Sequence, residues 1–491
     1  MSYQPHQHHR TDLVRIATQA MIDRGLAPEF SAHALGQLAD ITGPGHDDSP
    51  DILDLTDLLW CSIDNDDSMD LDQLTVCESL PHGALRIQVA IADVDALVRL
   101  GSPIDSHARL NTTTVYTSAR IFPMLPERLS TDLTSLNPQQ NRLALVTDMV
   151  FDADGTLKES TLYRALVRNQ AKLAYDAVSA WIEGSGVLPA AAAAVPGMAA
   201  QLQLQDAMAQ HLRALRHAQG SLEFESSQPR AVFEGSRVVD LQQQVQNRAR
   251  QLIEEFMIAT NGCTARYLSS RGRASLRRVV RTPERWQRIV TVAHDRGHTL
   301  PAEPDAKALS DFLAAQHRKD PLHFQDLSLI IVKLLGSGEY TVESPNTEPV
   351  GHFGLAVRDY THSTAPNRRY PDLITARLLK ATLKGEPSPY AKAELDLLAQ
   401  HCTTQEDAAQ KVERQMRKSD AAMVLESRVG QRFDALVTGS TPSGVWVRIF
   451  LPPAEGKLID GQEGLNVGDA LRVKLVGTNV ERGFIDFVRV G

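Results

Sequence analysis

The 491-residue sequence predicts an α+β protein. Alternating apolar and polar residues, typical of strands, predominate between about residues 50 and 170. Apolar residues at helical spacing follow at 198–217 and 242–268. After about residue 427, short strand patterns separated by glycines are typical of a small barrel. We therefore expect a mixed domain of sheet and helices followed by a small all-β domain.

Residues 1–48 predict two short helices. Apolar residues recur at helical spacing before Gly25 and again after Pro28, at Leu13, Ile16 and Met21 and then at Ala32, Leu35 and Leu38. Gly43-Pro44-Gly45 ends this unit. A pair of helices joined by a glycine turn is compatible with a module of the helix-turn-helix type.

An acidic segment precedes the first long strand pattern. It contains five aspartates, Asp64, Asp66, Asp67, Asp70 and Asp72. Such a group repels itself at neutral pH unless a cation lies within it. Asp70 and Asp72 share one face of an extended chain, and the turn-forming residues 65–68 can fold Asp64 back towards them. An all-oxygen site of this kind suits magnesium or manganese, whereas the alternative interpretation is a solvated acidic loop.

The surroundings favour the metal site over the loop. A calcium loop of the EF-hand type fits poorly, because Met69 and Thr75 stand where that loop has glycine and glutamate. Residues 85–91 alternate as a half-buried strand, so the acidic segment is attached to a sheet. Residues 143–151 and 156–167, separated by an Asp-Ala-Asp-Gly turn, predict a hairpin in the same sheet.

Several short motifs follow one another between about residues 50 and 420. They are Ile63-Asp64 with Ser68-Met69-Asp70-Leu71-Asp72, Val89–Asp93, Phe122–Pro126, Gly220–Phe224, Leu252–Met257, His352–Leu355 and Tyr360–Asp372. These motifs and their order resemble the catalytic segment of the ribonuclease II family, which includes ribonuclease R. The resemblance implies an RNB catalytic domain over 49–424. It also implies processive 3′-to-5′ hydrolysis of single-stranded RNA to nucleoside 5′-monophosphates.

The resemblance also implies roles for individual residues. Asp64, Asp70 and Asp72 match the catalytic carboxylates that hold metal, Mg²⁺ in the first place and Mn²⁺ as an alternative. Arg368 matches the arginine that contacts the phosphate near the cleaved bond, and Arg369 follows it in the same RNA-binding motif. A planar guanidinium suits a phosphate better than an ammonium group does. A structural salt bridge is the alternative for Arg368.

Three further positions match RNA-binding residues of the family. Tyr116 corresponds to the aromatic residue that packs on the 3′-terminal nucleotide, and Glu413 to the acidic residue near that base. Phe224 is a candidate for stacking farther along the RNA. Without the resemblance, Tyr116 is equally typical of a core residue and Glu413 of the surface. Glu254 and Glu255 are expected on a helix surface or in the RNA channel.

One position departs from the family pattern. Gln73 stands where relatives have a second consecutive aspartate, and an amide is neither an anionic ligand nor a base at neutral pH. Asn367 also replaces an aliphatic residue. Three interpretations remain open: three carboxylates bind metal with slower chemistry, Asp66 or Asp67 compensates, or the protein binds RNA without cleaving it.

Residues 425–491 resemble an S1 domain, an OB-fold that binds RNA. Trp446, with Phe433 and Phe450, offers aromatic faces on which bases can stack. Trp446 is equally compatible with a place in the barrel core.

Composition limits the remaining possibilities. The net charge of −9 argues against unspecific coating of nucleic acid, although two basic clusters occur, at 266–288 and 368–384. Each cluster is also typical of a solvated helix face. No apolar run approaches the roughly 20 residues of a membrane span, and four scattered cysteines form no Cys-x-x-Cys pair. We expect a cytoplasmic monomer with no membrane partner.

Overall fold

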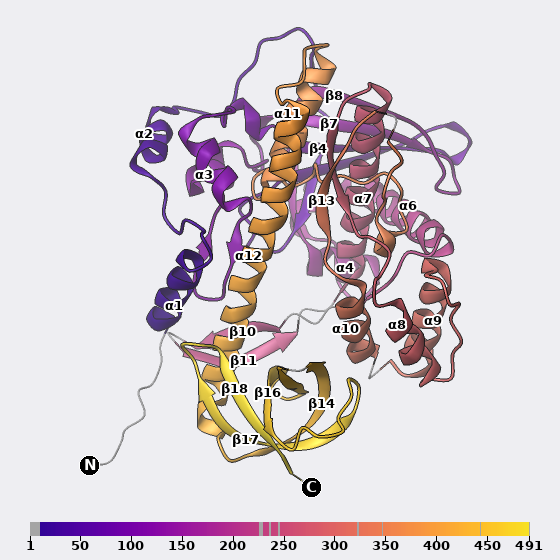
Figure 1. Cartoon of the computed structure of the whole chain (residues 1–491). Helices are drawn as coiled ribbons and strands as arrows, with labels where there is room; N and C mark the ends of the chain where they lie inside the picture. The colour runs from indigo at the N-terminus through magenta and orange to yellow at the C-terminus, as the bar shows by residue number, and fades with distance from the viewer. Residues whose placement is uncertain are drawn as a thin grey trace.

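Figure 1 shows the computed structural model, which describes residues 10–224, 229–234, 237–243, 246–321, 324–345, 347–441 and 443–490. A mixed sheet with helices on both faces forms the upper part, and a small barrel lies below it. This arrangement confirms the expected α+β fold class. Across these described ranges, no helix is both long enough and apolar enough to cross a membrane.

The central sheet has seven strands in the order β1-β8-β7-β4-β3-β2-β9. Their bounds are β1 Ile52–Asp54, β2 Cys61–Asp64, β3 Gln73–Ser79, β4 Leu85–Ala92, β7 Asn141–Phe151, β8 Leu157–Arg168 and β9 Ala171–Ala174. The strands from β2 to β8 in this order pair antiparallel, while β1 with β8 and β2 with β9 pair parallel. The predicted strand at 85–91 and the predicted hairpin are β4 and the β7–β8 pair, so both predictions are confirmed.

Alternation along β4 explains why helices cover both faces of the sheet. Ile87, Val89 and Ile91 pack in one core cluster with α6 (Met198–Ala218) and α7 (Arg248–Ser270). The intervening Ala90 and Ala92 pack in another cluster with α11 (Tyr370–Leu383). Successive side chains of a strand point to opposite faces. The larger apolar residues of β4 therefore face α6 and α7, and the alanines face α11.

The remaining helices pack in four of the core clusters. Their bounds are α1 Arg10–Ile22, α2 Ala32–Asp40, α3 Pro103–Asn111, α4 Tyr175–Ile182, α5 Ala190–Ala193, α8 Trp286–His294, α9 Ala306–Lys319, α10 Phe324–Leu335 and α12 Lys392–Leu425. Helices α8, α9 and α10 share a core cluster of their own. Short strands complete the body, namely β5 Val115–Tyr116, β6 Ile121–Phe122, β12 Ser275–Val279 and β13 Glu339–Glu343.

The prediction of a helix over 242–268 was wrong at the N-terminal end of the helix. Residues 237–243 form strand β11 (Arg237–Gln243), which pairs with β10 (Pro229–Glu234). Helix α7 begins only at Arg248, where the Asn247 side chain accepts a hydrogen bond from the Arg250 N–H. An asparagine N-cap satisfies one of the free amides of the first turn, so it sets this boundary. The other predicted helix, at 198–217, is confirmed as α6.

Helix α12 connects the body that contains the central sheet to the barrel (Figure 1). Its 34 residues span about 50 Å. Leu398 and Cys402 pack in the core of the sheet, whereas Val412 and Met416 pack in a cluster with α1 and the barrel. The two predicted N-terminal helices are α1 and α2. Helix α1 joins the α12 cluster, while Ala34 of α2 packs beside α3, so the two contact different parts of the protein.

The C-terminal strands form a closed barrel in the order β14-β15-β16-β18-β17. Their bounds are β14 Arg432–Thr441, β15 Gly444–Ile449, β16 Ala454–Asp460, β17 Ala470–Asn479 and β18 Phe484–Val490. The predicted barrel is therefore confirmed. Val437, Val447 and Phe487 are fully buried inside it, whereas Trp446 is only half-buried.

Candidate functional site

The acidic segment folds back on itself as the turn-forming residues predict. Asp64 ends β2, and its Oδ1 accepts hydrogen bonds from the Asn65 N–H at 2.7 Å and the Ser68 hydroxyl at 2.9 Å. Asp70 then returns close to Asp64. Burial raises the pKa of Asp70, and the charge of Asp64 adds to this rise. The structure therefore brings two of the three predicted carboxylates together.

Asp72 is 2% exposed, and both of its carboxylate oxygens accept hydrogen bonds from one distant loop. The Asn367 N–H donates to Oδ1 at 3.0 Å, and Arg368 Nε donates to Oδ2 at 3.1 Å. Burial raises the pKa of Asp72 to about 7; Arg368 opposes this rise and Asp70 adds to it. The predicted arginine and the predicted carboxylates thus share one site. The salt bridge considered for Arg368 exists, but it is made to a residue of that site.

Tyr116 and Glu413 lie beside these carboxylates. The Tyr116 hydroxyl donates to Asp70 Oδ2 at 3.3 Å, and the Tyr116 N–H donates to Glu413 Oε1 at 3.0 Å. The tyrosine is 42% exposed, so it is not a core residue. Burial raises the pKa of Glu413. Two residues that the sequence related only through the family resemblance are therefore in direct contact.

Arg369 makes different contacts from Arg368. Its Nη2 lies 2.8 Å from Oδ1 of Asp372, a fully buried carboxylate at the start of α11. The same carboxylate oxygen accepts the Ala365 N–H at 2.9 Å. Arg369 therefore braces the loop that carries Arg368, and a contact of Arg369 with RNA stays a prediction.

Gln73 is the first residue of β3, directly after Asp72, and its side chain is 8% exposed. Asp66 and Asp67, the two candidates to compensate for Gln73, are both exposed on the turn. In the part of the chain that the structure describes, no three His, Cys, Asp or Glu side chains form a group able to hold a metal by themselves. A metal at this site would therefore need ligands from a substrate or from water.

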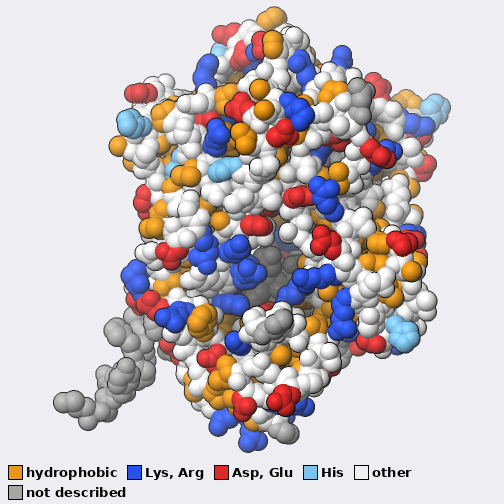
Figure 2. Space-filling view, viewed as in Figure 1, with side chains coloured by type: hydrophobic (Ala, Val, Ile, Leu, Met, Phe, Trp, Pro, Cys, Tyr) orange, Lys and Arg blue, Asp and Glu red, His pale blue; other side chains and the backbone are white. Residues whose placement is uncertain are grey.

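A large cavity lies between α10, α12 and the barrel. Its volume is about 890 Å³, and Phe224 and Trp446 both line it, one from the body and one from β15. The cavity wall is basic, with Arg285, Arg288, Lys333, Arg414, Arg417, Lys418 and Arg448. Figure 2 shows Lys and Arg side chains around a hollow above the barrel. Arg417 Nη1 is 3.8 Å from Glu413 Oε2, so the cavity comes within one helical turn of Glu413.

Comparison with known proteins shows to which family the chain belongs. Residues 52–385 match the RNB domain, and residues 431–490 match the RNase II-type exonuclease C-terminal S1 domain. The chain belongs to the RNB family. These matches confirm the resemblance seen in the motifs. The domain boundaries after residues 48 and 424 stay predictions.

The relatives of this RNB protein include ribonucleases R. That of Aquifex aeolicus is 29% identical over 476 residues, covering 88% of this chain and 64% of the relative. That of Escherichia coli is 31% identical over 413 residues, covering 81% of this chain and 50% of the relative. The chain thus spans between half and two thirds of the length of these relatives.

Two solved structures share the RNB fold and S1 barrel at low sequence identity. Mycoplasma genitalium RNase R in complex with ribose-methylated single-stranded RNA has a TM-score of 0.87 at 23% identity, covering 98% of this chain and 78% of that chain. Yeast Ssd1, described as a pseudonuclease, has a TM-score of 0.71 at 16% identity, covering 93% and 56%. Since a nuclease and a pseudonuclease share this fold, the fold alone does not establish cleavage.

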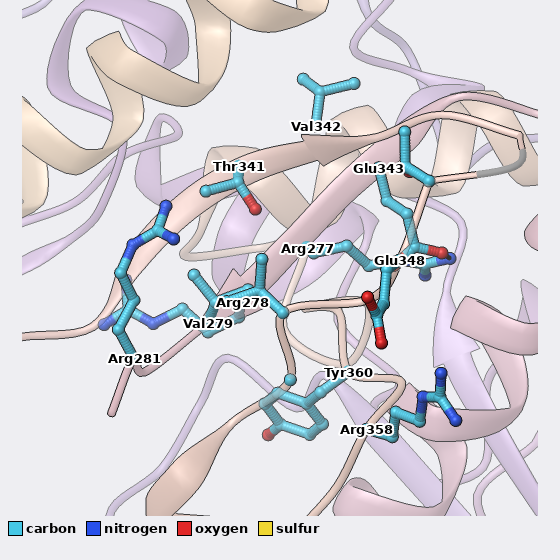
Figure 3. Close-up of a pocket in the computed structure, with 13 residues that line it drawn as sticks. Arg277, Arg278, Val279, Arg281, Thr341, Val342, Glu343, Glu348, Arg358 and Tyr360 are labelled. Carbon is cyan, nitrogen blue, oxygen red and sulfur yellow. Dashed lines mark hydrogen bonds and ion pairs between the residues drawn. The ribbon is translucent and has the colours of Figure 1, made fainter. Parts of the chain in front are cut away.

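Most of the basic residues in the two sequence clusters, at 266–288 and 368–384, form ion pairs within the protein. Arg277 pairs with Glu343 and Arg278 with Glu406, while Arg377 and Lys380 pair with Asp95. Figure 3 shows Arg277, Arg278 and Arg281 lining a pocket of about 280 Å³ together with Glu343 and Glu348. These pairs neutralise much of the charge of the two clusters, while Arg285 and Arg288 of the first cluster line the cavity.

Sequence reasoning missed several residues of the site. Arg250 Nη2 donates to Asn65 Oδ1 at 2.7 Å, and its guanidinium lies 4.4 Å from the centre of the Tyr175 ring. Both come from segments with no acidic motif, so no local pattern pointed to them.

Glu254 is exposed on α7, as one of its two expected positions requires. The surface is wrong for Glu255, which is 3% exposed and pairs with Arg216 through both oxygens. A place in the RNA channel stays a prediction.

Proposed function

We propose that this RNB protein is a metal-dependent exoribonuclease. It hydrolyses single-stranded RNA processively from the 3′ end and releases nucleoside 5′-monophosphates. The observation that carries the proposal is the convergence of Asp64, Asp70 and Asp72 with Arg368 and Tyr116 at one site. Family membership supports the same conclusion.

Asp64, Asp70 and Asp72 are suited to a divalent cation. Their donor atoms are all oxygen. Burial raises the pKa of Asp70 and of Asp72, whereas the charge of Arg368 lowers both, so a nearby cation favours the ionised carboxylates. Mg²⁺ commonly binds one or two carboxylates, while waters and substrate phosphates supply its other ligands. When bound, the ion would supply an activated water and neutralise charge on the phosphate.

Arg368 would bind the phosphate at the cleaved bond. Its Nε is fixed on Asp72, and the side chain is 44% exposed, so its terminal N–H groups are accessible to a phosphate. A guanidinium held in one orientation reaches two phosphate oxygens without reorganising during the reaction. Asp72 thus orients the cation as well as contributing a carboxylate.

The RNA would run from the cavity to Tyr116. Phe224 and Trp446 offer stacking faces in a basic cavity, a combination that binds single strands with little dependence on sequence. Tyr116, with its N–H on Glu413, would pack on the terminal nucleotide. This order puts the 3′ end at the carboxylates.

A second candidate function is RNA binding without cleavage. The observation that favours it is Gln73, a buried amide directly beside Asp72. An amide adds no negative charge to hold the metal. The cavity and Arg368 would still bind RNA in that case.

A time course on 5′-labelled single-stranded RNA of about 30 nucleotides distinguishes the two functions. The exonuclease yields a short labelled product without intermediates, with Mg²⁺ but not with a chelator, and leaves DNA intact. A strand ending in a 3′-phosphate controls for the direction of attack. RNA that is bound but uncut in Mg²⁺ and in Mn²⁺ would overturn the proposal in favour of the second function.

A further inference from the structure

The segment Thr134-Ser135 lies between the loop that carries Asp70 and Asp72 and the loop that carries Arg368. It follows a single π-helical stretch, Arg128–Leu133, a rare conformation that often occurs at functional sites. Ser135 is fully buried, and Thr134 is 5% exposed. Neither residue carries a charge, and neither belongs to the predicted site.

Ser135 holds the loop that carries the carboxylates. Its hydroxyl accepts the Leu71 N–H at 2.9 Å. The hydroxyl hydrogen is shared between the Met69 carbonyl at 2.8 Å and Asn137 Oδ1 at 3.1 Å. Asp70 lies between these two residues, so both of its flanking peptide groups are fixed. The Leu136 N–H adds a bond of 3.0 Å to the Leu71 carbonyl.

Thr134 holds the loop that carries the arginine. Its hydroxyl lies 3.0 Å from Asn367 Oδ1 and 2.9 Å from the Leu129 carbonyl, and its hydrogen is shared between these acceptors. Asn367 is fully buried, and its own N–H donates to Asp72. An aliphatic side chain at 367 would have no oxygen to offer the hydroxyl, so the asparagine is what makes this connection.

We propose that Thr134 and Ser135 are positioning residues that fix the carboxylate loop, residues 69–72, relative to the arginine loop, residues 365–368. The two residues are adjacent, so their Cα atoms are about 3.8 Å apart and the loops they bind move together. Loss of either hydroxyl leaves a buried polar group without its partner. The two loops are then held together only by the bonds of Asp72 to Asn367 and Arg368, so their relative position is less tightly fixed. The inference rests on the proposed exoribonuclease function, because that function gives the spacing of the loops its chemical importance.

The first test is kinetic and uses Thr134→Val, Ser135→Ala and Asn367→Leu. A misplacement of about 1 Å can lower a rate about 100-fold, so we expect the single-turnover cleavage rate to fall about 10- to 100-fold. RNA affinity, measured with a chelator present, should change less than about threefold because the stacking residues lie elsewhere. Thr134→Ser keeps the hydroxyl and should retain the wild-type rate.

Ser310→Ala is the matched control. Ser310 is also buried, at 7% exposure, and its hydroxyl also donates to a carbonyl, that of Ser221. It should leave the cleavage rate unchanged. Equal losses in Ser135→Ala and Ser310→Ala, or full activity in Thr134→Val, would overturn the positioning role.

The second test does not depend on turnover. Hydrogen exchange of the wild-type protein should show slow exchange at the Leu71 and Asn367 amides, because both donate to buried acceptors. Thr134→Val should speed exchange about tenfold or more in both loops, although it touches only the arginine loop directly. If Thr134→Val speeds hydrogen exchange only in residues 365–368, the inference is overturned. A wild-type protein that cuts no RNA but shows coupled loops would contradict the proposed function and leave the coupling established.

Discussion

Arg368 and Asp72 form an ion pair of 3.1 Å although 296 positions separate them in the chain. The pair joins the loop before α11 to the strand β3 that continues from the acidic segment. Asp72 is almost fully buried, whereas Arg368 remains 44% exposed. The exposed cation is therefore anchored by a buried carboxylate, which gives it a fixed orientation at the opening of the site.

Replacing Arg368 tests this anchoring. Arg368→Lys keeps the charge but lacks the planar fork that binds Asp72 and a phosphate together, so we expect cleavage to fall about 100-fold. Single-turnover kinetics on labelled RNA measure the change. The control Arg482→Lys alters an exposed arginine in the β17–β18 turn and should have no effect. Wild-type rates for Arg368→Lys would show that charge alone suffices.

Gln73→Asp should increase the affinity for metal. The new carboxylate would be buried beside Asp72, so it should lower the Tm without metal, and Mg²⁺ should restore the loss. We expect cleavage at limiting Mg²⁺ to rise about tenfold or more. Gln201→Glu, another buried change of amide to acid, should lower the Tm without recovery by Mg²⁺. Equal Mg²⁺ dependence of wild type and Gln73→Asp would exclude a metal at this position.

Removing an aromatic face of the cavity should weaken RNA binding. Trp446→Ala and Phe224→Ala should each cost about 1–3 kcal/mol, an increase of about 5- to 150-fold in Kd. Fluorescence anisotropy with a chelator present measures this without cleavage. Phe484 is 54% exposed on the barrel but does not line the cavity, so Phe484→Ala is the matched control. A similar loss in all three variants would contradict binding in the cavity.

The buried carboxylate of Asp420, in α12, should make the stability of the folded protein depend on pH. It is 3% exposed, the Ser118 hydroxyl donates to it at 2.8 Å, and Arg417 is the nearby cation. Burial raises the pKa of Asp420 from 3.8 to about 7. Between about pH 4 and pH 7, therefore, this carboxyl carries a proton in the folded protein but has lost it in the unfolded chain. Stability therefore falls as pH rises from about 4 to 7. Asp420→Asn should raise the Tm at pH 8 by about 2–4 °C and leave it unchanged near pH 4. An equal shift at both pH values would contradict this assignment.

Much of the fold followed from local patterns in the sequence. Period-2 alternation predicted β4 and the β7–β8 hairpin, and glycine-punctuated strands predicted the barrel. The start of α7 was wrong because residues 237–243 have apolar residues that suit a strand equally well, and pairing with β10 decides between the two. Short apolar segments carry too little information to exclude either structure.

The chemistry of the site was predictable where it resides in acidic or family motifs. The turn at residues 65–68 indicated that Asp64 folds back, and the structure agrees. Thr134, Ser135, Tyr175 and Arg250 were missed because their contacts join segments far apart in the chain, and uncharged or isolated residues leave no local signal. Ion pairing of Arg277 and Arg377 was equally hidden, since their acidic partners lie on other elements.

Cleavage by Asp72→Asn tests the central claim most directly. The change keeps an oxygen for the Asn367 N–H but removes the charge that orients Arg368 and contributes to metal binding. With Mg²⁺ present, we expect no detectable turnover of single-stranded RNA, while RNA affinity and the Tm stay near wild type. Asp66→Asn, in the same acidic segment but exposed, should cleave normally. Undiminished cleavage by Asp72→Asn, or loss of cleavage in Asp66→Asn, would contradict the assignment of the site to Asp64, Asp70 and Asp72.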